Sequence, residues 1–574
     1  MEKSFAKSIA LIGGGPAALF MLKRILENPG LCNSVFIFEK YNQLGVGMPY
    51  GTHGACYEHI TNISDRELPE LETTIKNWIA FAPHEMLQQF GIDQDSFNED
   101  KVVPRLLFGK YLEEQFDILR KKARQQHLRV EVLFNTEVTD MADLPETGKI
   151  MITDHNNNSY EFDSAVVCIG HRWPKIYEDK IPGWYDSPYP PSKLKKITDF
   201  PVAVRGASLT AVDVVKTLSR ENGVFSQRAD GMLTYKVHPG SSNFKIVLHA
   251  LGGLLPAVRF HLSQSALSTE LALPEEEIRV CKEANNGFVD LDYIYQQHFL
   301  VPLKKSKPEL YETVKNLSLE DFVEHMMAVR RKVEPFKLLK AEYTEAQKSI
   351  ERHESVVWKE LLASLSYTIN YAAKHFSAED MLRMRKVLMP LVSIIIASLP
   401  QSSCREFLAM HDAGVLEMVA VGPDSECIPN EKGGAIYQYR DENNMEQTTY
   451  YELFIDAIGQ APMPFQQFPF EGLKEQGAIS AAHVLFKDDK IGEKAFRAGD
   501  PTVRENGHGK YYLQVSGISI NDSLQILDRY GAINDRIYIL AVPYIGGLNP
   551  DYSGLDFCEA GSLRIIEALR LLHH

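Results

Sequence analysis

The sequence predicts an α/β fold with two Rossmann-like dinucleotide-binding domains and a large helical insertion. Two glycine-containing turns, which begin at Gly13 and Gly206, each follow an apolar strand and precede an apolar helix. Between residues 257 and 415, apolar residues recur with a helical period and strand-like alternation is nearly absent. Turns of this kind join strands and helices of parallel sheets, so they predict two such sheets, with the helical region inserted in the second.

The first turn lies between the apolar segments 9–12 and 19–25 and fits the pattern G-x-G-x-x-[GA] with Gly13, Gly15 and Ala18. The first glycine permits the tight turn, the second lets the backbone approach a phosphate, and the small third residue lets the helix pack on the strand. The amide groups that open the helix then face an anion. The turn therefore predicts a pyrophosphate-binding site.

A second apolar strand, residues 35–38, ends at Glu39. A carboxylate at this place can accept hydrogen bonds from both hydroxyls of a ribose. The alternative is a signal peptide, but three glycines and a proline interrupt the apolar stretch and no small-residue cleavage site follows before Lys23. We interpret residues 9–39 as a dinucleotide-binding βαβ unit.

Composition narrows the classes of protein. A chain of 574 residues is too long for one ordinary core, so two or three domains are expected. The longest apolar runs fall short of a membrane span, and we expect a cytoplasmic protein. The formal net charge of −15 argues against binding to nucleic acid or to anionic membranes, while it leaves room for a local basic pocket. The seven cysteines are scattered and contain no C-x-x-C pair, so we expect buried thiols and no metal site.

The second turn follows the apolar segment 202–204 and places Gly206, Ser208 and Ala211 at the three small positions. Serine in place of the middle glycine crowds the approach of a phosphate. The hydroxyls of Ser208 and Thr210 can donate hydrogen bonds in partial compensation. We interpret this segment as a second, degraded nucleotide-binding turn.

Several short segments match one family in order along the chain. Besides the two turns they are Leu44-Gly-Val-Gly-Met-Pro-Tyr-Gly51, His59-Ile-Thr-Asn62, Val103-Pro-Arg105-Leu-Leu-Phe-Gly-Lys-Tyr111-Leu, Ile169-Gly170, Ser187-Pro-Tyr189 and Ile458-Gly459-Gln460. With these segments the chain resembles the bacterial FAD/NAD(P)-binding protein family, which is related to flavin-containing monooxygenases and amino-acid N-hydroxylases. The resemblance covers most of the chain outside the helical region.

The resemblance implies FAD as the cofactor and NADH or NADPH as a candidate second nucleotide. The first turn would hold the FAD pyrophosphate, Glu39 the adenosine ribose, and residues 45–50 with Asn62 would lie along the isoalloxazine. Arg105 would lie near the flavin or its substrate, and the alternative for Arg105 is a surface ion pair. The expected cofactor-binding residues are Gly13, Gly15, Pro16, Ala17, Ala18, Glu39, Lys40, Gly45, Gly47, Met48, Tyr50, Asn62, Arg105, Gly170, Gly206, Ser208, Leu209, Thr210 and Gly459.

Five prolines between Pro174 and Pro191 indicate a loop that crosses between domains. The expected domains are an FAD-binding domain in residues 1–185 and 450–574, an NAD(P)-binding-like domain in residues 186–256 and 416–449, and the helical insertion in residues 257–415. The insertion is expected to be either a lid or dimer surface, or one wall of a substrate pocket.

The chain also departs from the family. Where related enzymes carry a Ser-Arg-Arg type of run that holds the 2′-phosphate of NADPH, this chain has Ala250-Leu-Gly-Gly253. A phosphate without a guanidinium loses its bidentate contacts. With Ser208, this indicates NADH, weakened nicotinamide binding, or a domain that has lost its nucleotide. Phe108 replaces a family tyrosine near the expected flavin pocket.

The leading hypothesis for function is an FAD-dependent oxidoreductase, specifically an NAD(P)H-using monooxygenase that acts on a small molecule such as an amino-acid amine. A dicarboxylate substrate would need paired cations, for which Arg330 and Arg331 are available, although a solvated helix face is the better interpretation of that pair. One alternative is an FAD-dependent oxidase or dehydrogenase that does not use NAD(P)H. The other is a non-catalytic FAD-binding or partner-binding protein, and a homo-oligomer is a further possibility. The sequence names no catalytic side chain, because a flavin carries much of such chemistry itself.

Overall fold

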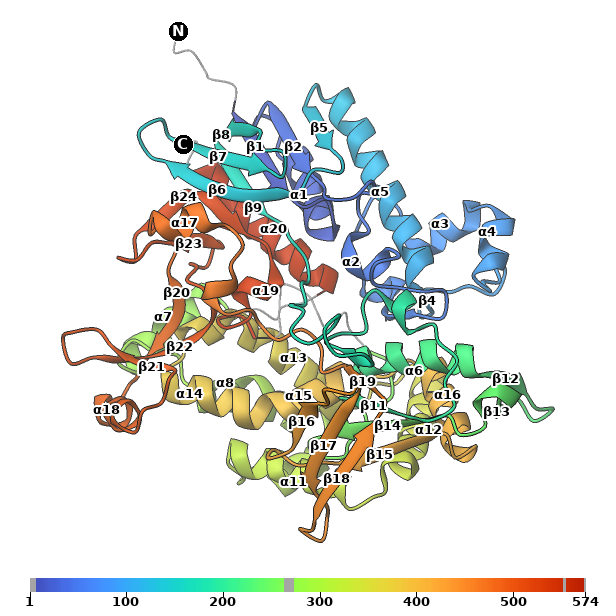
Figure 1. Cartoon of the computed structure of the whole chain (residues 1–574). Coiled ribbons are helices and arrows are strands. Elements are labelled where there is room, and N and C mark those ends of the chain that lie inside the picture. The colour runs from blue at the N-terminus through green and yellow to red at the C-terminus, as the bar shows by residue number, and fades with distance from the viewer. Residues whose placement is uncertain (1–6, 263–272, 551–553, 572–574) are drawn as a thin grey trace.

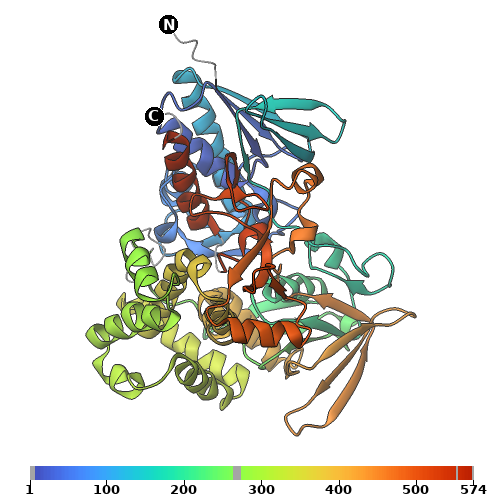
Figure 2. The same ribbon diagram turned by 90° about the vertical axis from the view of Figure 1, so that its left-hand side faces the viewer.

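The computed structural model describes residues 7–262, 273–550 and 554–571, and it is built from two mainly parallel sheets and a group of helices (Figure 1). The first sheet lies in the upper part of the view and the second in the lower right part. Turning the molecule by 90° shows that the helices of the middle third of the chain gather below the first sheet (Figure 2).

The first sheet has six strands in the order β23-β24-β9-β1-β2-β5. Strand β1 pairs in parallel with β2 and β9, while β23 is antiparallel to its neighbour β24. The central strands β1, β2 and β9 are apolar after an initial serine, which is typical of strands that are covered on both faces. The strands are β1 (Ser8–Ile12), β2 (Ser34–Phe38), β5 (Arg129–Leu133), β9 (Ser164–Val167), β23 (Gln525–Leu527) and β24 (Ile533–Ile539).

Helices and a three-stranded meander surround this sheet. Helix α1 (Pro16–Leu26) follows the first turn and packs against α5 (Arg105–Gln125) and α20 (Gly554–Leu571). The meander consists of β6 (Val138–Leu144), β7 (Lys149–Asp154) and β8 (Ser159–Phe162) and lies between β5 and β9 in sequence. Shorter elements between β2 and α5 are α2 (Gly47–Tyr50), β3 (Ile60–Ser64), α3 (Ile75–Phe81), α4 (His84–Gln89) and β4 (Val102–Pro104).

The second sheet has five parallel strands in the order β10-β19-β11-β14-β15, and it repeats the connectivity of the first. Strand β11 is followed by a turn and a helix, as β1 is, and a meander again precedes the strand that returns beside it. The strands are β10 (Trp184–Tyr185), β11 (Pro201–Arg205), β14 (Lys245–Ala250), β15 (Leu416–Ala420) and β19 (Leu453–Asp456); the helix is α6 (Leu209–Asn222). The meander is β16 (Glu426–Pro429), β17 (Ala435–Arg440) and β18 (Glu446–Tyr451), and a hairpin of β12 (Gly223–Gln227) and β13 (Leu233–Val237) follows α6.

Strands β10 and β19 lie at chain positions that the expected boundaries give to the FAD-binding domain. Both are hydrogen-bonded into the second sheet, with Val202 facing Leu453 and Trp184 facing Phe454. In the structure, residues 184–185 and 453–456 therefore belong to the second sheet, because their backbones are hydrogen-bonded into it.

Every regular element described between β14 and β15 is helical, as the periodicity predicts. The helices are α7 (Glu275–Ala284), α8 (Leu291–Tyr295), α9 (Val301–Ser306), α10 (Pro308–Val314), α11 (Leu319–Arg331), α12 (Pro335–Arg352), α13 (Val357–Ala372), α14 (Ala378–Arg383), α15 (Met389–Ile396) and α16 (Gln401–Asp412).

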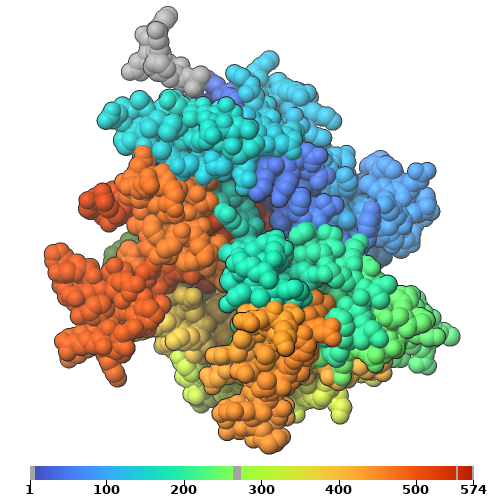
Figure 3. Space-filling model, in the orientation of Figure 1, coloured from blue at the N-terminus to red at the C-terminus, as the bar shows by residue number. Residues whose placement is uncertain are grey.

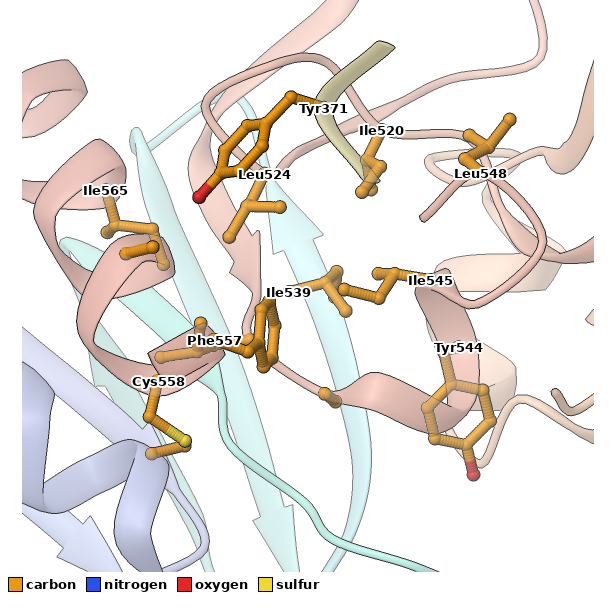
Figure 4. Close-up of a cluster of buried hydrophobic side chains, with 14 of the residues drawn as sticks. Tyr371, Ile520, Leu524, Ile539, Tyr544, Ile545, Leu548, Phe557, Cys558 and Ile565 are labelled. Atoms are coloured by element: carbon orange, nitrogen blue, oxygen red, sulfur yellow. The ribbon is translucent and has the colours of Figure 1, made fainter. Parts of the chain in front are cut away.

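Helix α12 belongs to the core of the second sheet through Phe336, Leu339 and Ala346. The other helices from α8 to α15 share a hydrophobic core with the first sheet. Figure 4 shows the place where they join: Tyr371 at the end of α13 lies beside Ile520 and Leu524, close to Ile539 of β24 and Phe557 of α20. Helix α16 instead packs with the second sheet, in a separate core that contains Phe407. The shared core sets α13 next to the start of α20.

The remaining C-terminal elements form a small sheet, β20-β22-β21, with α17, α18 and α19 nearby. The part around α18 projects at the lower left of the space-filling view (Figure 3). The bounds are α17 (Glu471–Glu475), β20 (Ala481–Leu485), α18 (Asp489–Arg497), β21 (Val503–Glu505), β22 (Tyr511–Ile518) and α19 (Val542–Ile545). Among the described residues, no helix combines the length and the apolar character that crossing a membrane requires.

Candidate functional site

The first turn has a backbone that a side chain would disrupt. Gly13 has φ +105°, and a Cβ atom there would lie 2.8 Å from the carbonyl oxygen of Cys168 at the end of β9. Its N–H donates to the carbonyl of Phe38 at 2.8 Å. Gly15 is extended and precedes Pro16, the first residue of α1. Ala18, the third residue of α1, is fully buried. The turn therefore joins the ends of β1, β2 and β9 at one point.

A second glycine loop lies against the first turn. The N–H of Gly45 donates to the carbonyl of Gly14 at 2.7 Å, and a Cβ on Gly45 would lie 2.6 Å from the carbonyl oxygen of Leu112. A Cβ built on Gly15 would lie 3.2 Å from the Cα of Gly47. Two bare backbones thus face each other at the start of α1, where a helix N-terminus favours negative charge. These residues fit a pyrophosphate.

Glu39 lies at the end of β2 and is 8% exposed. Its Oε2 accepts the N–H of Gly14 at 2.7 Å, and its Oε1 accepts the N–H of Tyr41 at 2.8 Å. Burial raises the pKa of Glu39, although these two donors oppose the shift. Each oxygen keeps a further lone pair, so the carboxylate retains the capacity to accept the hydroxyls of a ribose. The adjacent Lys40 is held at the surface by Glu137, with Nζ and Oε1 2.8 Å apart.

The other residues expected along the first cofactor site lie at the ends of neighbouring elements. Met48 and Tyr50 belong to α2, and the Tyr50 ring makes an edge contact with Phe108 at 4.8 Å between centroids. Burial raises the pKa of Tyr50 to about 12, so its hydroxyl stays protonated near neutral pH. Gly170 follows β9, and no atom lies within 4 Å of a Cβ built on it. Phe108 is 1% exposed, so it packs in the core where the resemblance expects a hydroxyl.

Arg105 opens α5 and reaches α6 of the second sheet. Its Nη1 donates to Oδ2 of Asp213 at 2.6 Å, and its Nε donates to the carbonyl of Ile60 at 3.1 Å. The hydroxyl of Tyr189 donates to the same Oδ2 at 2.7 Å. The side chains of Arg105 and Asp213 are 17% and 4% exposed, so this is a largely buried pair and not the surface ion pair that was the alternative for Arg105.

His59 extends this network. Its Nε2 lies 3.0 Å from Oγ1 of Thr217 and 3.2 Å from the carbonyl oxygen of Asp213, and its Nδ1 accepts the N–H of Cys56. Burial lowers the pKa of His59, which favours the neutral ring. Buried polar contacts therefore join His59 and Arg105 to helix α6 of the second sheet.

The second turn has the same backbone geometry as the first. Gly206 has φ +111°, a Cβ there would lie 2.7 Å from the carbonyl oxygen of Ala457, and its N–H donates to the carbonyl of His249 at 2.8 Å. Ser208 is extended and exposed at the start of α6, followed by Leu209 and Thr210. A Cβ on Gly459 would lie 3.5 Å from Oγ1 of Thr210. The strand register sets Ala250 at the position that Glu39 holds in the first sheet, so the second site lacks a carboxylate there.

A cavity of about 260 Å³ brings Tyr50 and Asn62 together with side chains from distant parts of the chain. One wall is α13, and another is the start of α20. The polar and charged residues that line it are Tyr50, Asn62, Glu67, Arg259, Lys359, Tyr367, Asn370, Ser398 and Asp556, and the apolar ones include Ile63, Phe260, Leu262, Ile395, Ile396 and Leu555.

The interpretation of Arg330 as part of a solvated face is wrong. Arg330 is 5% exposed and donates two hydrogen bonds to Glu342 of α12, at 2.7 and 3.1 Å, so the two charges are buried as a pair. Arg331 does lie at the surface, where it pairs with Glu324.

All seven cysteines are free, and six of them are buried. In the parts of the chain that the structure describes, no group of three or more His, Cys, Asp or Glu side chains is placed to hold a metal ion.

Residues 10–172 match the family model described as FAD-NAD(P)-binding. The chain contains an FAD/NAD(P)-binding domain. This match confirms the predicted resemblance and the predicted cofactor class, FAD and NAD(P). Residues 274–396 match a second model, described as a YdhS-like middle domain, which coincides with helices α7 to α15.

Known proteins resemble the chain over most of its length. It is 26% identical over 483 residues to the uncharacterized protein YdhS of Escherichia coli (strain K12), which covers 82% of this chain and 86% of that protein. Among solved structures, the ornithine hydroxylase PvdA from Pseudomonas aeruginosa is 10% identical, with 99% and 100% of the two chains covered and a TM-score of 0.47. The FAD-bound cadaverine monooxygenase DfoA from Erwinia amylovora is 11% identical, with 99% and 95% covered and a TM-score of 0.44.

The FAD/NAD(P)-binding domain supplies the residues that sequence analysis places at the first turn, and the structure brings them together. The cavity adds residues that the sequence analysis missed, namely Arg259, Lys359 and Asp556. The signal for Lys359 is its spacing: Lys359, Ala363, Tyr367 and Asn370 recur on one face of a helix. Such a face looks like an ordinary packing face until its partner is known.

Proposed function

We propose that the chain is an FAD-dependent oxidoreductase, and specifically a monooxygenase that takes its electrons from NADH or NADPH. The observation that carries the proposal is the pair of glycine loops around Gly15 and Gly47, with the buried acceptor Glu39 beside them. Bound FAD supplies the electron transfer in enzymes of this kind, while the protein supplies position, exclusion of water and hydrogen bonds.

The chain's own residues have separate tasks in this proposal. Gly13, Gly15 and Gly45 keep side chains away from the pyrophosphate, and Glu39 holds the adenosine ribose. Residues 45–50 and Asn62 line the isoalloxazine. Tyr50, held protonated by burial, donates its hydroxyl proton in a hydrogen bond toward the cavity.

The second sheet is proposed as the nucleotide-binding-like domain. Its support is the repeated connectivity and the backbone of Gly206, which matches that of Gly13. Residues 250–253 supply no guanidinium for a 2′-phosphate, so NADH is the better donor. The substrate is a small molecule such as an amino-acid amine, bound in the cavity beside Tyr50, with helix α13 as one wall.

A second candidate is an FAD-dependent oxidase or dehydrogenase that draws electrons from its substrate. It is favoured by one observation, the alanine at position 250 where the first sheet has Glu39. Without that carboxylate, a nicotinamide nucleotide loses the hydrogen bonds to its ribose.

An anaerobic absorbance experiment separates these candidates. The purified protein is recorded as isolated and then with NADH and with NADPH. Bleaching of a flavin band by either nucleotide supports the monooxygenase and identifies the donor. A flavin band that persists with both refutes the use of NAD(P)H and leaves the oxidase, which would form hydrogen peroxide from its substrate, or a non-catalytic FAD-binding protein.

A substitution tests the first turn itself. Gly15→Val places a branched side chain where a Cβ already lies 3.2 Å from Gly47, so it blocks the phosphate, and the protein should be isolated without yellow colour. Gly240→Val is the matched control, because Gly240 is exposed and no atom lies within 4 Å of a Cβ there. A fully flavinated Gly15→Val protein would refute the assignment.

A further inference from the structure

The cavity beside Tyr50 runs along one face of α13. Its lining residues on this helix are Lys359, Ala363, Tyr367 and Asn370, which lie on one side of a helix because they are three or four residues apart. From Lys359 to Tyr367 the helix rises by about 12 Å, at roughly 1.5 Å per residue. A volume of about 260 Å³ is too small for a dinucleotide and suits a small molecule.

Lys359 brings a positive charge to one end of this cavity. It is 2% exposed, and its Nζ lies 5.9 Å from the ring centroid of Phe260, which also lines the cavity. The ammonium donates to Glu342 at 3.0 Å and to Glu345 at 2.8 Å. An ammonium has three N–H donors, so one donor remains for a ligand.

The carboxylates around Lys359 are themselves compensated. Glu342 receives two hydrogen bonds from Arg330, so its charge is shared between two cations. The side chain of Glu345 is 49% exposed, so water screens its charge. The two cations Lys359 and Arg330 thus balance the two carboxylates, and two of the three N–H donors of Lys359 are used by them.

Arg259, the other cation that lines the cavity, already has partners within the protein. It pairs with Glu67 and donates to the carbonyl oxygen of Asn62. Glu67 is fixed in turn by the N–H and hydroxyl of Ser64, at 2.9 and 2.6 Å. Burial lowers the pKa of Arg259 to about 10, so it stays charged and neutralises Glu67 near neutral pH.

The cavity lining also contains a carboxylate, Asp556. Asp556 lies in the first turn of α20, and its charge contributes, after burial, to the raised pKa values of Tyr50 and Tyr367. Lys359 lies about two helical turns from Tyr367, the residue near which Asp556 lies.

We propose that this cavity binds a small molecule that carries a carboxylate, that Lys359 receives the carboxylate, and that the rest of the molecule faces Tyr50 and Asp556. The chemistry at Tyr50 rests on the proposed function, whereas the binding of the carboxylate does not. Lys359 is in this view a residue that determines specificity, and it belongs to the segment that matches the YdhS-like middle domain.

The test compares two probes of the same shape, succinate and its neutral diamide succinamide, by calorimetric titration of the full-length protein as isolated. Wild type should bind succinate at least tenfold more tightly, since a hydrogen bond to a buried charged group is worth about that factor or more. Lys359→Met, which keeps the length and removes the charge, should abolish the preference, and Lys359→Arg should restore part of it.

Two further variants guard against a purely structural effect. Lys374→Met removes a lysine that is also buried and paired, with Asp522 at 3.0 Å, but does not line the cavity, so it should leave the preference unchanged. Glu345→Gln removes a half-exposed competitor for the ammonium and should tighten succinate binding by about two- to fivefold. A lysine with only a structural role would not produce this gain.

The proposal is overturned if wild type does not bind succinate or binds succinamide equally well. It is also overturned if Lys359→Met and Lys374→Met behave alike, or if Glu345→Gln weakens the binding. A protein that carries no flavin but shows the Lys359-dependent preference would refute the proposed function and leave the cavity assignment standing. A flavin-containing protein without that preference would refute the cavity assignment and leave the proposed function standing.

Discussion

Replacing Asp213 by asparagine should loosen the junction between α5 and α6. The substitution keeps the shape of the side chain and removes the charge that Arg105 faces at 2.6 Å. Asp213 is 4% exposed, and breaking a buried ion pair by removing one partner costs about 3–5 kcal/mol. Tyr189 also loses a charged acceptor. Its hydrogen bond belongs to the same network, so the cost of about 3–5 kcal/mol already includes it.

Hydrogen exchange measured by mass spectrometry reports this loss locally. A cost of about 3–5 kcal/mol corresponds to roughly 10²- to 4 × 10³-fold more frequent opening, because each 1.4 kcal/mol is a factor of ten. Peptides from α5 and α6 should lose protection by this factor, while peptides from β22 should not. Glu137→Gln, which breaks the exposed pair with Lys40, is the control and should change protection by less than about 1 kcal/mol.

A double-variant cycle refines the test. In Arg105→Met combined with Asp213→Asn, no buried charge is left without a partner, so the combined loss should be smaller than the sum of the single losses. The reasoning fails if the two losses add, or if Asp213→Asn reduces protection no more than Glu137→Gln does.

Two other predictions concern carboxylates. Glu39→Gln should lower flavin retention about tenfold, because the amide NH2 cannot accept the N–H bonds of Gly14 or Tyr41; the flavin absorbance of the purified variant measures this, and unchanged retention would contradict the role of Glu39. The second prediction concerns acid stability. Burial raises the pKa of Asp213, but the charge of Arg105 and the other contacts outweigh it, so the pKa lies below its ordinary value. The stability that this carboxylate provides is therefore present above about pH 4 and is lost as the pH falls through the folded-state pKa. Urea unfolding between pH 5 and pH 3 should show a steeper loss for wild type than for Asp213→Asn, and equal slopes would refute the link.

The parts of the fold that sequence predicted depend on local rules. The turn at Gly13 could be recognised because only glycine adopts its backbone and because the apolar strand and helix flank it directly. The turn at Gly206 has the same flanking pattern, and within residues 257–415, where a helical period was expected, the structure has helices α7 to α16. Each of these signals is contained in a window of about twenty residues.

The parts that sequence did not predict depend on distant partners. The pairing of β19 with β11 joins residues about 250 positions apart, which no local pattern encodes. Arg105 could be named, but its partner Asp213 lies on another helix. The cavity requires Tyr50, Lys359 and Asp556 to line one space, and they come from α2, α13 and α20, which are far apart in the sequence.

The hydrophobic core that Tyr371, Ile520 and Phe557 share has a consequence for how the molecule comes apart. A segment whose apolar side chains are buried by another part of the chain cannot unfold without exposing that other part. Helices α8 to α11, helices α13 to α15 and the first sheet should therefore melt as one cooperative unit, while the second sheet, with α12, α16 and its own core around Phe407, is free to melt separately. The boundary at which the molecule separates first should therefore lie between the two hydrophobic cores, and it does not coincide with the ends of a family model. Arg105 and Asp213 are among the side chains that bridge this boundary, as are His59 and Thr217.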